Sequence, residues 1–273
     1  MRTAFEDIQS PSNPTVKMLK GLERKKVRRE TGLFLAEGMR LVQQGLSAGW
    51  TIKTLIVSSD LANRPDIQAL AEQARGARLI SASQRVMGQV ARKDNPQTVI
   101  GAFEQQHRSL ADLPNTKAGL WIGLYQVRDP GNLGTILRTA DCAGIEGVVL
   151  IGTGCDPYSL ESVRASMGSV FDTPFATATP DEFSSWCKST STQRIAASMN
   201  GSVRHDEPNY DSSSLILMGN EQSGLPDDIE KTCEHLVRIP MRGGADSLNL
   251  AQATAIMTFE AWRQRGFDGA REQ

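Results

Sequence analysis

Three segments in the second half of this 273-residue chain carry the residues best suited to chemistry. The first, Val127–Ala143, reads VRDPGNLGTILRTADCA and predicts a turn followed by a helix with Asn132 as its N-cap. Gly131 and Gly134 would let the main chain come close to a ligand. Arg138, within the helix, would either project from the edge of a sheet toward a ligand or pair with a buried carboxylate. The sequence GNLG lacks the third glycine of the dinucleotide-binding pattern GxGxxG, so no dinucleotide site is predicted here.

The second segment, Leu215–Pro226, reads LILMGNEQSGLP and predicts an apolar strand followed by a glycine-bearing turn. Gly219, Asn220 and Glu221 occupy the start of that turn. Open α/β sheets bind ligands at the carboxyl ends of their strands, which is where this turn would lie. A plain strand-to-helix loop fits the same residues.

The third segment, Arg238–Asn249, reads RIPMRGGADSLN and predicts a strand end, a flexible polar loop and the start of the last helix. Ser247 is a natural N-cap for that helix. Together with Asn249 and the exposed main-chain N–H groups of the helix start, Ser247 could instead hold a polar ligand. Taken alone, each of the three segments is weak evidence for a site.

The elements that would position these segments alternate between strand and helix. After residue 118 the sequence predicts apolar strands at 119–124, 147–151, 194–198, 214–218 and 236–239, and helices at 132–143, 159–167 and 248–263. Strands this apolar indicate a parallel sheet covered by helices on both faces. The serine-rich stretches 184–192 and 212–214 predict surface loops. The expected fold of this half is therefore an α/β domain with a parallel sheet.

The first hundred residues predict a smaller α/β unit. Helices are expected at 14–29, 39–46, 66–74 and 83–91, and extended segments at 33–35, 52–57, 78–80 and 98–103. Residues 105–117 are polar and include Pro114 and Asn115, which is typical of a linker. We therefore expect a first domain at 1–106, a linker at 107–117 and a second domain at 118–273.

Charge is distributed unevenly along the chain, although the net charge is only −1. Residues 1–110 carry 17 Lys and Arg against 10 Asp and Glu, whereas the remainder carries 13 against 21. The densest run is Lys17–Arg29, where seven of thirteen residues are basic. A basic half on a nearly neutral protein indicates a polyanionic partner. A solvated helix face explains the run equally well.

Composition excludes several other classes of protein. Hydrophobic residues make up 39% and charged residues 22%, as in ordinary globular domains. No apolar run is long enough to span a membrane, and the N-terminus does not resemble a targeting signal. The four cysteines are widely spaced, which fits reduced thiols in a cytoplasmic protein. With only three scattered histidines, no metal site is expected.

In this order and at these spacings, the three segments resemble the SpoU/TrmH family of RNA 2′-O-ribose methyltransferases, within the SPOUT superfamily. The residues similar to the family's three motifs are Asn132, Gly134 and Arg138, then Gly219, Asn220 and Glu221, then Ile239, Pro240, Met241, Ser247, Leu248 and Asn249. The sequence RASMGS at 164–169 also resembles the family. The N-terminal QSPSNPTVKMLKGL, with FLAEG at 34–38, resembles a substrate-binding domain that many members carry. Gln222 departs from the pattern, because a glycine is expected directly after the glutamate.

The resemblance implies a small L30e-like first domain and a SPOUT domain whose C-terminal segment forms a trefoil knot. It implies S-adenosylmethionine as the methyl donor, held by Met199, Gly219, Ile239, Met241, Leu248 and Asn249. It also implies a catalytic group consisting of Arg138, Asn132, Glu221, Ser247 and Asn249. Arg138 would stabilise developing negative charge, because an arginine side chain stays protonated in proteins. Family members are usually homodimers through the C-terminal domain, with each active site completed across the interface.

The substrate that the resemblance implies is structured RNA. Ribosomal RNA of the 23S type is favoured, because the first domain resembles that of ribosomal RNA enzymes. The basic residues expected to hold the RNA are Lys17, Lys25, Lys26, Arg28 and Arg29. A tRNA 2′-O-methyltransferase and a non-catalytic RNA-binding protein of the same fold are alternatives. A nucleotide-binding α/β enzyme is a third, and the absence of both a Walker A sequence and GxGxxG argues against it.

Overall fold

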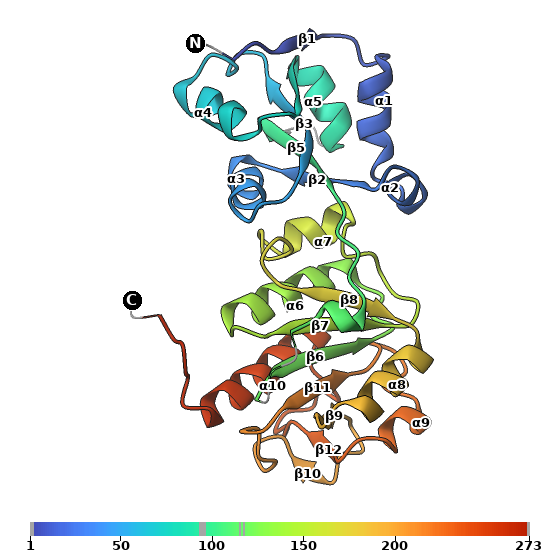
Figure 1. Cartoon of the computed structure of the whole chain (residues 1–273). Helices are drawn as coiled ribbons and strands as arrows, with labels where there is room; N and C mark the ends of the chain where they lie inside the picture. The colour runs from blue at the N-terminus through green and yellow to red at the C-terminus, as the bar shows by residue number, and fades with distance from the viewer. Residues whose placement is uncertain (1–2, 93–96, 115, 117, 272–273) are drawn as a thin grey trace. The chain divides into compact units, whose positions relative to one another are not determined.

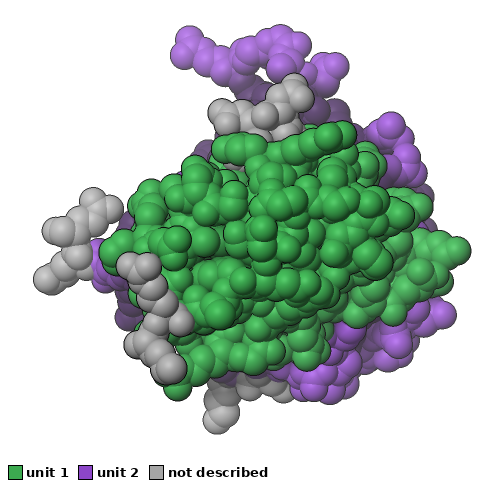
Figure 2. Space-filling view, turned by 90° about the horizontal axis from the view of Figure 1, so that it is seen from above, with its two compact units in different colours: residues 1–106, 156–171 green, residues 107–155, 172–273 purple. Residues whose placement is uncertain are grey.

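The computed structural model describes residues 3–92, 97–114, 116 and 118–271, which form two compact units. The first unit contains the chain up to Gln106 together with residues 156–171 (Figure 2). The second unit contains residues 107–155 and 172–273. Each unit has its own sheet, as the alternation of strands and helices predicts.

The first unit is built on a mixed five-stranded sheet with the strand order β1-β4-β3-β5-β2 (Figure 1). Its strands are β1 (Glu6–Ile8), β2 (Leu33–Glu37), β3 (Ile52–Ser58), β4 (Arg78–Ala82) and β5 (Val99–Glu104). Its helices are α1 (Pro14–Gly21), α2 (Lys25–Thr31), α3 (Met39–Ser47), α4 (Pro65–Gln73), α5 (Gln84–Ala91) and α7 (Leu160–Ala165). The β5 strand runs antiparallel to β2 and β3, whereas β1, β3 and β4 run parallel. The expected small α/β unit is confirmed.

The single helix expected at 14–29 is wrong, because the chain turns between α1 and α2. Leu22 is buried at this turn and packs in the core of the unit. The main-chain carbonyls of Leu22 and Glu23 accept hydrogen bonds from Nη1 of Arg28, at 2.8 and 2.6 Å. The break therefore costs little, since a side chain takes the place of the helical donors.

Residues 156–171, which the sequence assigns to the second domain, pack into the first unit. The Tyr158 ring lies 4.7 Å from the Phe34 ring, measured between centroids. The indole Nε1 of Trp50 donates to the main-chain oxygen of Phe171 at 2.9 Å. Burial of these aromatic side chains thus places residues 156–171 in the first unit, although they fall within the continuous second domain expected at 118–273.

The second unit is built on a seven-stranded sheet with the order β10-β12-β9-β11-β6-β7-β8. Its strands are β6 (Leu120–Tyr125), β7 (Gly147–Ile151), β8 (Phe175–Ala178), β9 (Gln193–Ala197), β10 (Val203–Arg204), β11 (Ser214–Met218) and β12 (His235–Arg238). Its helices are η1 (Leu110–Asp112), α6 (Pro130–Cys142), α8 (Pro180–Ser189), α9 (Asp227–Glu230) and α10 (Leu250–Gln264). Every pairing in this sheet is parallel. The parallel sheet expected from the apolar strands is therefore confirmed.

Helices cover both faces of this sheet (Figure 1). On one face, Leu215 and Leu217 of β11 share a core cluster with Phe183 of α8 and Ile229 of α9. Successive side chains of a strand point to opposite faces, so Ile216 points to the other side. There α10 packs on β11 and against α6. The edge of the sheet between these layers is where the three segments of interest begin.

Two local expectations fail in the second unit. The serine-rich stretch 184–192 is largely helix α8 rather than a loop, because Thr179 and Glu182 form a capping box at its start. Part of the linker expected at 107–117 is the short helix η1, with a second capping box between Ser109 and Asp112. Asn115 and Lys117 lie outside the described residues.

Candidate active site

The sheet of the second unit brings the three segments to one edge. Strands β12, β9, β11 and β6 are neighbours and parallel, so their carboxyl ends lie side by side. Met199 follows β9, Gly219 follows β11 and Ile239 follows β12, while α6 follows β6. This edge is the usual ligand-binding position of an open parallel sheet.

The start of α6 frees the side chain of Asn132 for a role in the site. Asp129 is the N-cap, and its Oδ1 accepts from the main-chain N–H of Asn132 at 2.7 Å. The expected cap at Asn132 is therefore wrong by three residues. The Asn132 side chain instead donates from Nδ2 to Oε1 of Glu221 at 3.1 Å, and its Oδ1 accepts from Nδ2 of Asn249 at 2.9 Å. One amide thus joins all three segments.

Glu221 is held as a fixed anion under the start of α6. Its carboxylate also accepts from the main-chain N–H groups of Arg128 and Asp129, each at 3.2 Å. Partial burial raises the pKa of Glu221. These hydrogen bonds and the one from Asn132 lower it by more, so the pKa lies below its usual value. Glu221 is therefore ionised at neutral pH and acts as an acceptor that fixes the loop.

Asn249, rather than Ser247, caps the last helix. Its Oδ1 accepts from the main-chain N–H groups of Ala251 and Gln252, at 2.9 and 3.3 Å. Because Oδ1 caps α10 and Nδ2 binds Asn132, the single side chain fixes α10 against the first segment. Ser247 is exposed and makes no hydrogen bond with the described residues.

The turn after β11 closes on itself without the glycine expected at position 222. Asn220 and Gly224 exchange two main-chain hydrogen bonds, at 3.0 and 2.9 Å. Gly224 has a φ of +65°, which favours glycine. A Cβ on Gly219 would lie 2.3 Å from the carbonyl carbon of Gly224, so only glycine fits there. The loop needs its glycines at 219 and 224, and position 222 is free to carry a side chain.

The third segment is an open loop with both apolar and polar groups available. Between Pro240 and Leu248 the main chain makes no hydrogen bond with any residue that the structure describes. Met241 in this loop is 43% exposed, and Met199 after the neighbouring strand is 71% exposed. Apolar side chains beside free main-chain donors and acceptors suit a flat, polar-edged ligand such as a purine.

Arg138 lies on another part of α6. Successive helical residues turn by about 100°, so Arg138 points about 120° away from Asn132 and lies about 9 Å further along the axis. Its side chain is exposed, and within the described chain it forms no ion pair. The buried carboxylate that one interpretation of the sequence paired with Arg138 is absent from the described residues. Arg138 does not join the Glu221–Asn132–Asn249 group within one chain.

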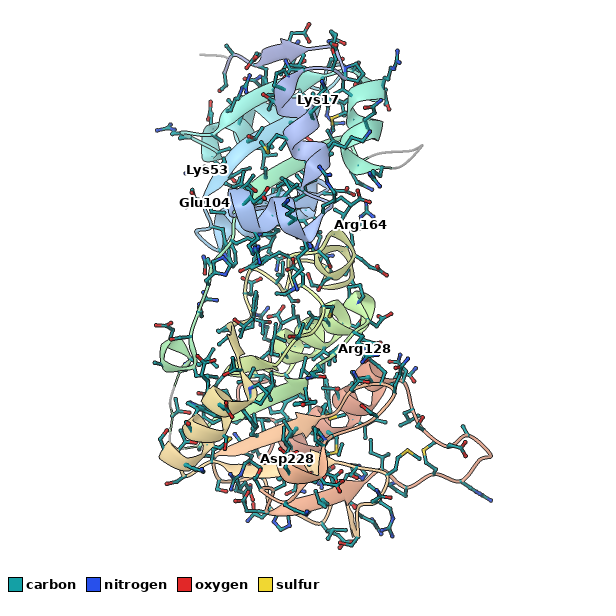
Figure 3. The ribbon with its side chains drawn as sticks, turned by 90° about the vertical axis from the view of Figure 1, so that its right-hand side faces the viewer. Lys17, Lys53, Glu104, Arg128, Arg164 and Asp228 are labelled. Carbon is teal, nitrogen blue, oxygen red and sulfur yellow. The ribbon has the colours of Figure 1, made fainter. Side chains whose placement is uncertain are left out.

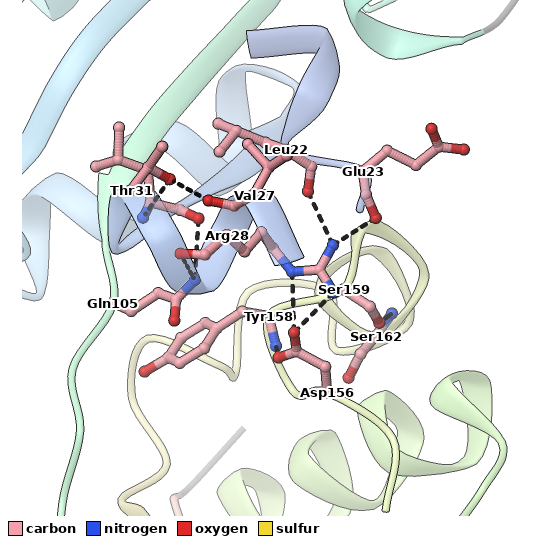
Figure 4. A network of polar contacts seen from close by, with 11 residues as sticks. Leu22, Glu23, Val27, Arg28, Thr31, Gln105, Asp156, Tyr158, Ser159 and Ser162 are labelled. Atoms are coloured by element: carbon pink, nitrogen blue, oxygen red, sulfur yellow. Dashed lines mark hydrogen bonds and ion pairs between the residues drawn. The ribbon is translucent and has the colours of Figure 1, made fainter. Parts of the chain in front are cut away.

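The basic run of the first unit divides into exposed and buried members. Four side chains expected to bind RNA are exposed: Lys17, Lys25, Lys26 and Arg29. Arg28 is only 3% exposed, and its Nε and Nη2 donate to Oδ2 of Asp156 at 2.9 and 2.7 Å (Figure 4). The expectation that Arg28 contacts RNA is corrected, because its guanidinium already binds a carboxylate and two carbonyls.

Arg128 and Gln222 also lie at this edge, although the motifs do not mark them as site residues. Nη1 of Arg128 donates to Oε1 of Gln222 at 2.9 Å, and the main-chain N–H of Arg128 donates to Glu221. The side chain of Arg128 is labelled in Figure 3. The only signal was Gln222 itself, which stands where a glycine is expected. A side chain at an otherwise glycine position indicates a partner that sequence spacing does not reveal.

Two general features concern the described residues alone. None of the helices there has the length and apolar character that crossing a membrane requires. Nowhere in those ranges do three or more His, Cys, Asp or Glu side chains group in a way that could hold a metal ion.

Known proteins match both units. Residues 119–259 match the SpoU rRNA methylase family, and residues 13–101 match the MRM3-like substrate binding domain. An AdoMet-bound rRNA methyltransferase from Sinorhizobium meliloti is 44% identical, with a TM-score of 0.89 over 95% of this chain and 98% of its own.

Two curated relatives add named reactions. A 23S rRNA (uridine(2479)-2′-O)-methyltransferase from Streptomyces viridochromogenes is 29% identical over 87% of this chain and 85% of its own length. A tRNA (cytidine(34)-2′-O)-methyltransferase from Methylovorus glucosotrophus is 32% identical over 55% of this chain and 97% of its own length. The region that matches the SpoU rRNA methylase family, residues 119–259, includes all three segments of the site, and the expected SpoU-type fold is confirmed. The chain belongs to the SpoU rRNA methylase family, and its first unit is a substrate-binding domain of the MRM3-like type.

Proposed function

We propose that this protein transfers a methyl group from S-adenosylmethionine to the 2′-hydroxyl of a ribose in 23S-type ribosomal RNA. The observation that carries the proposal is the hydrogen-bonded group Glu221–Asn132–Asn249, which fixes the three family segments at one sheet edge. A ligand site of this position and composition, in a member of this family, is the expected place for the reaction.

The choice of ribosomal RNA rests on which parts of the chain its relatives share. The 23S rRNA relative matches 87% of this chain and so includes the first unit. The tRNA relative matches 55% of this chain while using 97% of its own length. The tRNA relative is therefore too short to hold counterparts of both units, and possession of both units favours ribosomal RNA.

The residues present fit the methyl donor. Apolar contacts and free main-chain groups for an adenosine and an amino acid are available at five residues: Met199, Gly219, Ile239, Met241 and Leu248. When bound, S-adenosylmethionine supplies an electrophilic methyl group on a sulfonium sulfur. Asn249 and Asn132 then hold the loop and the helix that flank it, and Gly219 lets the turn after β11 close against Gly224.

Arg138 is proposed to stabilise the charge that develops on the ribose oxygen. A hydroxyl is a weak acid, so a fixed cation near its oxygen lowers the barrier to its attack. The guanidinium also suits the adjacent phosphate, with which it can form two parallel hydrogen bonds. Glu221 fixes the turn before α6, and Ser247 is proposed to contact the ribose from the open loop.

We propose that the protein acts as a homodimer through its second unit. Ile256 and Phe259 lie one helical turn apart on α10 and are 37% and 41% exposed. Arg138 is exposed on α6, the helix against which α10 packs. A second copy covering this face would bury the apolar side chains and bring its own Arg138 toward the site of its partner.

Three further parts of the proposal concern the first unit, the path of the chain and the place of action. Residues 1–106 are proposed to hold RNA phosphates through Lys17, Lys25, Lys26 and Arg29, which are exposed.

The segment from Ile239 onward is proposed to complete a trefoil knot, supported by the contact of Asn249 with the first segment. The ribosomal substrates of the named relatives support action in the cytoplasm.

The test is methyl transfer from tritium-labelled S-adenosylmethionine to ribosomal RNA and tRNA taken from a strain that lacks this protein. We expect label in ribosomal RNA, recovered after digestion as a 2′-O-methylnucleoside. Label in tRNA alone would replace the proposed substrate. No label in either fraction and no binding of the donor by calorimetry would favour a non-catalytic RNA-binding protein.

A further inference from the structure

Arg128 carries a positive charge at the candidate active site that no described carboxylate neutralises. Its main-chain N–H donates to Oε2 of Glu221, yet its guanidinium pairs with neither Glu221 nor Asp129. Nη1 instead donates to the side-chain oxygen of Gln222 at 2.9 Å. Gln222 is a neutral acceptor, so it orients the guanidinium and leaves its full charge in place.

Three other arginines of the second unit have their charge neutralised by a carboxylate: Arg194 by Glu234, Arg204 by Asp206 and Arg263 by Glu260. Arg128, like Arg138, has no such partner among the described residues. Arg128 is exposed, and the carboxylates of Glu221 and Asp129 accept hydrogen bonds from groups other than its guanidinium. The oxygens of Glu221 accept from two main-chain N–H groups and Asn132, and one oxygen of Asp129 accepts from the main chain of α6. A cation in this setting is free to bind an anion that arrives from solution.

The anion that the site must admit is an RNA phosphate. Every internal ribose is joined to a phosphodiester at the carbon next to its 2′-hydroxyl, so a phosphate enters with the reacting group. Glu221 and Asp129 would repel that phosphate, since both carry negative charge at this edge. The exposed guanidinium of Arg128 offsets the repulsion and can bind two phosphate oxygens.

We propose that Arg128 binds the phosphodiester beside the ribose that is methylated, and that Gln222 positions its guanidinium. The inference rests on the proposed function, because it takes RNA as the substrate. It assigns Arg128 to substrate binding and leaves the methyl donor to other residues. Gln222 acts through Arg128 and is a positioning residue.

The experiment compares variants in methylation of ribosomal RNA from a strain lacking the protein, with RNA binding measured across a range of salt concentrations. Arg128→Ala keeps the main-chain N–H that holds Glu221, so the loop is expected to stay intact. It should raise KM for RNA about tenfold while kcat changes less than about twofold. The slope of log affinity against log salt should fall by about 0.7 to 0.9, as for one lost phosphate contact.

Gln222→Glu separates charge from geometry. It has nearly the shape of glutamine and keeps the acceptor for Nη1, but it neutralises the guanidinium as an ion pair. We expect Gln222→Glu to raise KM more than Gln222→Ala, which frees the guanidinium without cancelling its charge. A merely structural role for the contact predicts the reverse order, with Gln222→Glu close to the unaltered protein, and would overturn the proposal.

Arg204→Ala is the matched control, because Arg204 is an exposed arginine of the same unit whose charge Asp206 already neutralises. It should leave KM and the salt slope unchanged. Binding of S-adenosylmethionine, followed by calorimetry, should be equal in all variants. If the unaltered protein methylates RNA and Arg128→Ala does so with the same KM, the inference fails alone. If the unaltered protein methylates no RNA, the proposed function fails instead.

Discussion

Two variants that are each inactive are expected to restore activity when combined in one dimer. Asn132→Ala removes both hydrogen bonds that link Glu221 to Asn249, while alanine keeps the main-chain N–H that Asp129 caps. One of the lost bonds is to a carboxylate, so the pair contributes about 2–4 kcal/mol. If the whole of this free energy acts in the transition state, its removal lowers the rate of methyl transfer about 30- to 1,000-fold. Arg138→Ala should cost about 100- to 1,000-fold, as for other fixed donors to a developing oxyanion.

The geometry of α6 decides where the restored activity comes from. Arg138 lies about 9 Å along the helix from Asn132 and points about 120° away, so one chain does not place both beside the same ribose. In a heterodimer of the two variants, assembled as proposed, the chain with Arg138→Ala keeps an intact Asn132 and would receive the arginine of its partner. One of the two sites is then complete, and the heterodimer should have about half the activity of the unaltered dimer.

The assay uses co-expression with two different affinity tags, sequential purification of the heterodimer and tritium transfer to ribosomal RNA. Each variant purified alone as a dimer provides the baseline. A heterodimer no more active than these would mean that Arg138 and Asn132 serve the same chain's site, and the argument from helix geometry would be refuted. Equal binding of S-adenosylmethionine by both variants serves as the check on folding.

Three further outcomes follow from the same contacts. Phe259→Glu places a charge on the exposed face of α10 and should convert the proposed dimer to a monomer, as measured by light scattering, with loss of methyl transfer. An unchanged mass would remove this face from the proposed interface. Alanine replacements of four exposed cations should reduce the slope of log RNA affinity against log salt by about 0.7 to 0.9 per lost phosphate contact. The four residues are Lys17, Lys25, Lys26 and Arg29. An unaltered slope would contradict their role in RNA binding. The pKa of Glu221 is lowered in the folded protein, so ionised Glu221 stabilises the fold fully above its ordinary pKa of 4.5. This contribution is lost as the pH falls through the lower pKa of the folded state. The stability of Glu221→Gln in urea unfolding should therefore be less sensitive to acid than that of the unaltered protein.

Local patterns predicted much of the fold, because the second unit's strands are almost wholly apolar. Residues 120–124 and 215–218 can only be buried, and burial on both faces requires the parallel sheet that the structure has. Ser184 and Ser185 predict a loop where the structure has helix α8. The stronger signals were its capping box and the spacing of Phe183 and Cys187, which share one buried face.

Long-range partners account for what the sequence could not supply. Arg28 belongs to a run of cations and is indistinguishable from its neighbours by spacing. Its burial is decided by Asp156, which lies 128 residues away in the chain. The site shows the same limit. The motifs single out Asn132, Glu221 and Asn249 as candidates, but only the hydrogen bonds of the structure show that the amide of Asn132 connects the other two.

The first unit should not fold from residues 1–106 alone, because residues 156–171 complete its interior. The Glu37 carboxylate is buried and accepts two hydrogen bonds from Arg164, at 3.0 and 2.6 Å. Leaving such a buried carboxylate without its partner costs about 3–5 kcal/mol. Arg28 would lose Asp156 in the same way, so the two losses rival the entire stability of a small domain, about 5–15 kcal/mol.

Restoring the segment should restore the fold. The hydroxyl of Tyr158 donates to the main-chain oxygen of Gln106 at 2.6 Å, so a short glycine–serine linker can join Gln106 to Asp156. We expect residues 1–106 alone to lack a cooperative urea transition by circular dichroism, and the fused chain to show one. A fused chain with Glu37→Gln and Arg164→Met keeps the apolar packing and removes the ion pair. If residues 1–106 alone unfold cooperatively at the same midpoint as the fused chain, then the aromatic and ionic contacts of 156–171 contribute nothing to the unit's stability, and the reasoning from their burial is wrong.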